Sequence, residues 1–168
     1  QSLRPYAAMI HVSWYEANAY CRWAGRRLPS ELEWEVAAAA QPTPDGSRLA
    51  TEKRRYPWGD AVPTPELANL DGYALGCIDV GALSAGDSAF GCRQMIGNVW
   101  EWTDSVFGPY PGFTPDMYAD YSQPLFGETR VLRGGSWATR GRLIRNTWRN
   151  YYAAHRNDVF AGFRTCAL

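Results

Sequence analysis

Gly97-Asn98-Val99-Trp100-Glu101-Trp102 is the stretch of sequence that decides the fold, and two related stretches follow it. They are Arg133-Gly134-Gly135-Ser136-Trp137 and Gly162-Phe163-Arg164. Each combines glycine, which reaches backbone conformations that other residues avoid, with a large aromatic ring that favours burial. These three stretches predict a fold held together by tight turns and aromatic packing more than by long helices.

The chain has 168 residues, 46% of them hydrophobic, which suits one domain expected over residues 1–168. Its 17 basic and 17 acidic residues balance to a net charge of zero. No excess of charge attracts nucleic acid or an anionic membrane, so neither is expected as a partner. The longest apolar run, Val36-Ala37-Ala38-Ala39-Ala40, is far shorter than the roughly 20 residues of a membrane span.

The four cysteines Cys21, Cys77, Cys92 and Cys166 lie far apart and form no C-x-x-C pair. This spacing argues against a zinc knuckle or a thioredoxin-like site. Because the chain has ample apolar core, buried thiols are favoured over a disulfide frame, although the disulfide alternative stays open. A reducing, cytoplasmic location is expected.

Two helices near the start are predicted by their caps. Ser13-Trp14-Tyr15-Glu16 and Ser30-Glu31-Leu32-Glu33 both match the S-x-x-E capping box. The first helix is expected to end near Gly25 and the second before residues 41–46, which contain two prolines. Both helices are expected to be purely structural. Their predicted buried stripes are Ala17, Tyr20, Cys21 and Ala24 in the first helix, and Leu32, Val36 and Ala39 or Ala40 in the second.

Residues 46–127 are expected to form mostly loops, since glycine or proline interrupts them every few residues. Ordered loops of this length are usually functional. Strands are expected where β-branched and aromatic residues gather. The predicted strands cover residues 100–103, 130–133, 145–151 and 160–166.

Further motifs extend the pattern along the chain: His11-Val12-Ser13-Trp14, residues 23–31 and Tyr56-Pro57-Trp58-Gly59. With the glycine–aromatic stretches, they make the chain resemble the formylglycine-generating-enzyme-type (sulfatase-modifying factor) domain as far as Arg164. The closest resemblance is to the C-terminal domain of the iron-dependent sulfoxide synthases of ergothioneine and selenoneine biosynthesis. It implies an α+β, C-type-lectin-like fold with two N-terminal helices, a small twisted antiparallel sheet and long loops.

Iron is not expected to be held by this domain alone. A non-haem iron site takes two histidines and a carboxylate, or three histidines, whereas this chain has only His11 and His155. The resembled synthases carry an additional N-terminal helical domain that lies outside these residues. The resemblance therefore implies that Fe(II) is held by that N-terminal domain, the expected partner of this one.

The resemblance also implies two calcium sites built from hard oxygen ligands. The family often has asparagine where Gln94 stands. An equally weighted alternative is that Asn98 and Glu101 only tie loops together through hydrogen bonds. The first implied set is the side chains of Gln94 and Glu101 with the carbonyls of Gly97 and Val99, and the second is Asn69, the Leu70 carbonyl and Asp79.

The best-known activity of the family oxidises a sulfatase cysteine to formylglycine, with copper held by two cysteines that follow the Gly-Gly-Ser-aromatic motif. Here the matching positions are Thr139 and Ile144, and residues 137–145 contain no cysteine. Without thiolates no Cu(I) site is expected, so formylglycine generation is disfavoured.

Arginine and asparagine are frequent in this region instead. The planar guanidinium suits bidentate capture of a carboxylate, and an ion-paired or solvated face is the alternative. In the resembled synthases, this segment helps to bind an amino-acid-like thiol or selenol co-substrate. The implied substrate-binding residues are Arg149, Asn150, Tyr152 and Arg156. Because Tyr152 stands where some members have an acid, the donor stays open among cysteine, γ-glutamylcysteine and a selenosugar.

Residues 107–118 are also typical of those synthases and are expected to line a cleft that faces the iron domain. In some relatives a tyrosine of this domain donates a proton. The catalytic candidates are Tyr110, Tyr118 and Tyr121, and a packed tyrosine is the alternative for each.

The resemblance implies one function, and a second stays open beside it. The first is the co-substrate-binding half of a non-haem iron, oxygen-dependent enzyme that forms a C–S or C–Se bond on hercynine. The second is a non-catalytic, lectin-like module that binds a ligand or a protein, since a fold does not fix a function. The chain begins at Gln1 without a signal-peptide pattern, so a processed chain or a fragment is expected.

Overall fold

Both predicted helices are present in the computed structural model, which describes residues 4–168. Helix α1 covers Trp14–Trp23 and helix α2 covers Glu31–Ala39. At the start of α1 the Ser13 hydroxyl accepts from the Glu16 N–H, and the Glu16 carboxylate accepts from the Ser13 N–H at 2.7 Å. Helix α2 begins with the same reciprocal pair. Both capping boxes are therefore confirmed.

The buried face of α2 differs from the predicted stripe. Trp34, Ala38 and Ala39 are buried, whereas Leu32 is 70% exposed and Val36 is 38% exposed. The prediction was right for Ala39 and wrong for Leu32 and Val36, because apolar spacing alone does not choose between two faces of a helix. Burying the large Trp34 indole removes more apolar surface from water than burying Leu32, and this decides the orientation.

Helix α1 packs through small residues. Ala17 and Cys21 are buried as predicted, while Tyr20 of the same expected stripe is about half exposed. All four cysteines are free thiols, so the disulfide alternative has no counterpart among residues 4–168. Burial raises the pKa of the Cys21 and Cys77 thiols and so keeps both protonated at neutral pH.

Within the part of the chain that the structure describes, four short strands form one sheet. They are β1 (Trp100–Val106), β2 (Arg130–Arg133), β3 (Asn150–Tyr152) and β4 (Ala161–Phe163). Their order is β3-β2-β1-β4, with β1 antiparallel to β2, β2 antiparallel to β3, and β1 parallel to β4. The sheet is mixed, and the predicted antiparallel sheet was wrong. Residues 153–160 cross between the two edges instead of turning back as a hairpin, so β4 keeps the direction of β3.

The strand bounds also depart from the prediction. The segments expected over residues 145–151 and 160–166 shorten to β3 and β4, because a strand extends only as far as its partner, and β2 offers β3 three pairing residues. Strand β1 continues to Val106 and not only to residue 103, with an irregularity in its register to β2 after Trp102.

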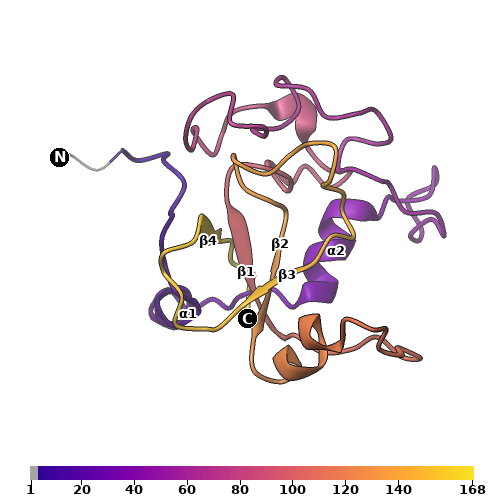
Figure 1. The fold of residues 1–168 in the computed structure, drawn as a ribbon. Coiled ribbons are helices and arrows are strands. Elements are labelled where there is room, and N and C mark those ends of the chain that lie inside the picture. Colours follow the sequence, from indigo (N-terminus) through magenta and orange to yellow (C-terminus); the bar gives the residue numbers. More distant parts are fainter. Residues whose placement is uncertain (1–3) are drawn as a thin grey trace.

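Helices α1 and α2 lie on two sides of the sheet (Figure 1). Trp102 points toward α1 and packs with Trp14 and Leu132. Its neighbour Glu101 points the other way and accepts a hydrogen bond from the Trp34 indole of α2 at 2.7 Å. Because side chains alternate along β1, each helix packs on its own face of the sheet.

The long loops are held by the stretch at residues 97–102. The Asn98 side-chain oxygen accepts from Asn69 Nδ2 at 3.2 Å and from the Ile78 N–H at 2.9 Å. Gly97 has a φ of 87°, and a Cβ there would lie 2.5 Å from the Asn69 carbonyl oxygen. This close backbone contact confirms that the turn requires glycine. Three short 3₁₀ helices interrupt the loops: η1 (Ser84–Gly86), η2 (Ala119–Tyr121) and η3 (Gln123–Leu125).

Between residues 4 and 168 no helix combines the length and the apolar character that crossing a membrane requires.

Candidate functional site

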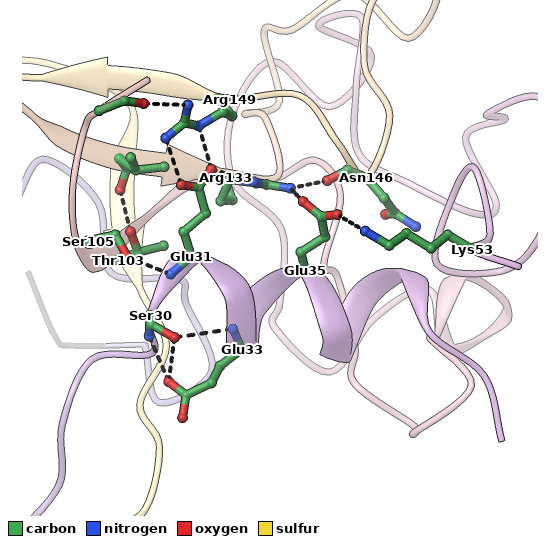
Figure 2. Close-up of polar contacts among 12 residues, drawn as sticks. Ser30, Glu31, Glu33, Glu35, Lys53, Thr103, Ser105, Arg133, Asn146 and Arg149 are labelled. Atoms are coloured by element: carbon green, nitrogen blue, oxygen red, sulfur yellow. Dashed lines mark hydrogen bonds and ion pairs between the residues drawn. The ribbon is translucent and has the colours of Figure 1, made fainter. Parts of the chain in front are cut away.

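Arg149, a predicted substrate-binding residue directly before β3, is paired within the chain itself (Figure 2). Its Nε and Nη2 atoms donate to the two oxygens of Glu31 at 2.6 and 2.8 Å, and Nη1 donates to the Gly108 carbonyl at 3.0 Å. The guanidinium lies 4.4 Å from the ring centre of Tyr110 and 4.8 Å from that of Phe107. Arg149 therefore connects α2 to the loop that follows β1.

A second arginine extends this contact into a buried network (Figure 2). Arg133 of β2 is fully buried and donates to Glu31 at 2.6 Å and to Glu35 at 2.7 Å. Lys53 donates to the other oxygen of Glu35 at 2.7 Å. Burial opposes ionisation of Glu35, but the hydrogen bonds from Lys53 and Arg133 outweigh it and lower the pKa of this carboxyl. Two carboxylates thus meet three cations.

Sequence reasoning missed these two acids, because it expected α2 to be purely structural. Glu31 and Glu35 lie four residues apart and so share one face of the helix, which is the signal that could have found them. Their partner could not be chosen from spacing, since Arg133 lies 102 residues after Glu31 in the chain.

The other predicted substrate-binding residues lie away from this network. Side chains alternate along β3, so Asn150 and Tyr152 share the face opposite to that of Arg149. Tyr152 packs against the core cluster beneath α1. Arg156 donates to Asp158 at 2.5 and 2.8 Å and lies 5.2 Å from the ring centre of Tyr152. Hydrogen bonding between them lowers the pKa of Asp158 and raises that of Arg156. The structure therefore brings Tyr152 and Arg156 together and separates Arg149 from them.

The three catalytic candidates, Tyr110, Tyr118 and Tyr121, all expose their rings, by 57%, 65% and 75%. Arg149 covers one face of Tyr110, whereas Tyr118 and Tyr121 line a separate hollow of about 270 Å³. The Tyr151 hydroxyl of β3 donates to the Tyr121 carbonyl at 2.7 Å. The loop that carries these tyrosines is therefore fixed to β3, the strand that carries two of the predicted substrate-binding residues.

Glu101, the predicted acidic calcium ligand, is already bound to a cation. It accepts from Arg164 Nε and Nη2 at 2.5 and 2.6 Å, and from the Trp34 indole N–H at 2.7 Å. Burial disfavours the charged form of Arg164, but the attraction of Glu101 outweighs it and raises the pKa of the guanidinium. The Oε1 atom of Glu101 receives one of these three bonds and keeps a lone pair for another ligand.

The first predicted calcium set offers oxygen atoms of the kind that a hard cation prefers. Gln94, Val99 and Glu101 line one cavity of about 330 Å³, to which the two cations Arg93 and Arg164 also contribute. The Gln94 amide nitrogen donates to the Asp79 carbonyl at 2.6 Å, while its Oε1 is buried without a partner among residues 4–168. Across the same described residues, the carbonyls of Gly97 and Val99 accept no hydrogen bond.

The second predicted calcium set is engaged in loop contacts. Asn69 Nδ2 donates to the Gly76 carbonyl at 2.9 Å and to Asn98, and the Asp79 carboxylate accepts from the Gly81 N–H at 2.7 Å. These contacts match the alternative in which polar side chains only tie loops together.

The positions considered for iron and copper have other surroundings. In the part of the chain that the structure describes, no three His, Cys, Asp or Glu side chains gather as a metal-binding group. His11 lies against Phe160, with ring centres 5.6 Å apart. At the copper positions Ile144 is buried, and the Thr139 hydroxyl accepts from the Ser136 N–H at 2.9 Å. Ile144 therefore packs in the core, and Thr139 stabilises a turn.

Comparison with known proteins agrees with this architecture. A sequence model of the sulfatase-modifying factor enzyme 1-like domain matches residues 3–167. The chain belongs to this family. The match confirms the resemblance drawn from the glycine–aromatic stretches.

Within the sulfatase-modifying factor family, two relatives named hercynine oxygenase are especially similar to this chain. The one from Mycolicibacterium thermoresistibile is 50% identical over 169 residues and covers 98% of this chain and 36% of its own length. The one from Mycobacterium tuberculosis is 53% identical over 155 residues, with coverage of 92% and 35%. The chain therefore spans about a third of the length of these relatives.

The structure of PvdO from Pseudomonas aeruginosa has a TM-score of 0.66 to this chain and 23% sequence identity, and covers 98% of this chain and 69% of its own. At this identity the likeness concerns the fold, and it confirms the α+β, C-type-lectin-like architecture that the sulfatase-modifying factor family implies.

Proposed function

We propose that this chain forms the co-substrate-binding domain of a non-haem iron, oxygen-dependent enzyme that acts on hercynine. The enzyme joins a thiol or selenol to the imidazole carbon of hercynine. The observation that carries this proposal is the 50–53% identity to hercynine oxygenases over 92–98% of the chain.

In this proposal Asn150 and Arg156 contact the amino-acid part of the co-substrate. The Arg156–Asp158 pair is solvent-exposed, with 41% and 63% of the two side chains accessible, so it is weak and can be exchanged for a substrate carboxylate. The Asn150 amide nitrogen donates no hydrogen bond among residues 4–168 and is free to do so. Arg149, held by Glu31, fixes the segment in place.

Iron supplies the oxygen chemistry, and we place its ligands outside this chain, in an N-terminal helical domain. The described residues do not offer the donor set that a non-haem iron needs. The contribution of this chain is then to bind and orient the co-substrate and to supply a proton from an exposed phenol, with Tyr110, Tyr118 and Tyr121 as the candidates.

In the enzyme extended to its natural length, Asn150→Ala and Arg156→Ala are expected to raise KM for cysteine or γ-glutamylcysteine. Loss of a charge-assisted hydrogen bond to the co-substrate should raise this KM by roughly tenfold or more. KM for hercynine should change by less than about twofold, because the two groups contact the other substrate. The measurement is steady-state kinetics with each substrate varied in turn, with Arg22→Ala on the exposed face of α1 as the control. Equal changes in both KM values would contradict the assignment.

We also propose that calcium binds at the cavity beside Gln94 and Glu101. Calcium at about 100 times its Kd should stabilise the chelator-treated chain by about 2.7 kcal/mol, which is roughly 5–10 °C in Tm for a domain of this size. Gln94→Leu keeps the side-chain volume but removes the unpaired oxygen, so it should abolish the shift. A thermal shift that magnesium reproduces, or that survives in Gln94→Leu, would count against the site.

A further inference from the structure

The loop between β1 and β2 has a composition unlike that of the rest of the chain. Residues 107–128 contain six aromatic residues and three acids, but no lysine, arginine or histidine. The loop therefore carries a charge of −3 in a chain whose net charge is zero. Aromatic faces and carboxylates both attract cations, the first through the ring quadrupole and the second through charge.

Within this loop a hollow of about 270 Å³ is lined by the aromatic residues Phe113, Tyr118 and Tyr121 and by Asp116, together with Thr114 and Ser122. One oxygen of Asp116 accepts from the Tyr118 N–H at 2.8 Å, which fixes the carboxylate at the wall. Tyr110 differs from the three lining rings because Arg149 already covers it. No cationic side chain among residues 4–168 lies over the lining rings, so their faces are available.

The hollow is anchored to the sheet by a chain of aromatic contacts. Phe113 meets Phe126 edge to face at 5.5 Å, Phe126 meets Phe107 at 5.2 Å, and Phe107 stacks on Tyr151 of β3 at 4.0 Å. The Tyr151 hydroxyl also holds the Tyr121 carbonyl. The Phe113 ring and the backbone at Tyr121 are therefore fixed before a ligand arrives, which reduces the entropy lost on binding.

We propose that this hollow binds the quaternary ammonium group of a small organic cation. A primary ammonium needs hydrogen-bond acceptors on several sides, whereas a quaternary ammonium donates no hydrogen bond and is held by ring faces and charge alone. Three aromatic residues and one acid among the six lining residues match that requirement, and the Ser122 hydroxyl is already engaged with the Ala119 carbonyl. The identity of the ligand rests on the proposed function: in that enzyme the group is the trimethylammonium of hercynine.

The test uses choline and its neutral analogue 3,3-dimethyl-1-butanol, which has the same shape without the charge. In NMR titrations of the full chain, the N-methyl resonance of choline should shift upfield and saturate, because the methyl groups lie over ring faces. The neutral analogue should bind several-fold more weakly. Tyr118→Leu and Tyr121→Leu should each weaken choline binding roughly threefold to fivefold, the effect expected for one exposed cation–π contact.

Two further variants distinguish a specific loss of choline binding in the hollow from a general loss of structure. Tyr118→Phe keeps the ring and should keep choline binding, and Tyr73→Leu, an exposed tyrosine outside the loop, should leave it unchanged. Equal binding of the charged and neutral ligands, or unaltered choline binding in both leucine variants, would overturn the proposal. Titration with hercynine and with histidine, which lacks the quaternary ammonium, then tests the ligand. If choline binding depends on Tyr118 and Tyr121 but hercynine binds no more tightly than histidine, the hollow stands as a quaternary ammonium site and hercynine is not its ligand.

Discussion

Replacing Arg133 with methionine is expected to lower the free energy of unfolding by about 3–5 kcal/mol, the cost of breaking a buried ion pair from one side. The guanidinium is fully buried and bridges Glu31 and Glu35 of α2. Methionine fills much of the space but removes the cation that joins the two carboxylates, leaving Glu31 with Arg149 alone and Glu35 with Lys53 alone in a poorly solvated site. Urea denaturation followed by circular dichroism measures the change.

Arg27→Met is the matched control, because Arg27 binds a third acid of the same helix, Glu33, in an exposed pair. Loss of the exposed Arg27–Glu33 pair should lower the free energy of unfolding by less than about 1 kcal/mol. Adding Glu31→Gln and Glu35→Gln to Arg133→Met should lower the stability further, since Arg149 and Lys53 then lose their carboxylate partners. Equal losses for Arg133→Met and Arg27→Met would show that the buried network does not stabilise the fold as described.

Among the glycines in the loop that follows β2, replacing Gly134 with alanine should lower the stability of the fold most. Gly134 has a φ of 91°, and a Cβ there would lie 2.6 Å from the Met95 carbonyl oxygen. Backbone strain and a clash with immovable backbone add together, so a loss of about 3 kcal/mol is expected. Gly112→Ala separates the two effects, because Gly112 has a φ of 80° but open space around it.

Gly112→Ala should therefore cost about 1 kcal/mol, the conformational part alone. Both variants can be compared by thermal unfolding of the same preparation. If their losses are equal, the close approach of Gly134 to Met95 does not constrain the fold.

Local signals predicted a good part of this fold. The two capping boxes each require only residues three apart, so the helix starts could be predicted from the sequence. The requirement for glycine at Gly97 likewise follows from its place beside large indoles, and the Asn69 backbone supplies the reason. The orientation of α2 and the parallel pairing of β4 could not be predicted, because both depend on which distant surface covers each element.

For the site, the sequence indicated what kind of group each side chain could bind, but not which residue of the chain it binds. The planar guanidinium of Arg149 indicated a carboxylate partner. In the structure this partner is Glu31, which lies 118 residues away in the chain. Tyr118 and Tyr121 were recognisable as candidates from the loop sequence. Their shared hollow with Asp116 depends on the path of the loop, which no short-range pattern specifies.

The measurement that tests the central claim most directly is oxygen-dependent product formation from hercynine, with cysteine, γ-glutamylcysteine or a selenosugar as the second substrate. It should be made with this chain alone and with the protein extended to its natural length, together with the iron content of each. The account predicts iron and a hercynine-derived C–S or C–Se product in the extended protein only. No iron and no turnover in either would contradict it and favour a non-catalytic binding module.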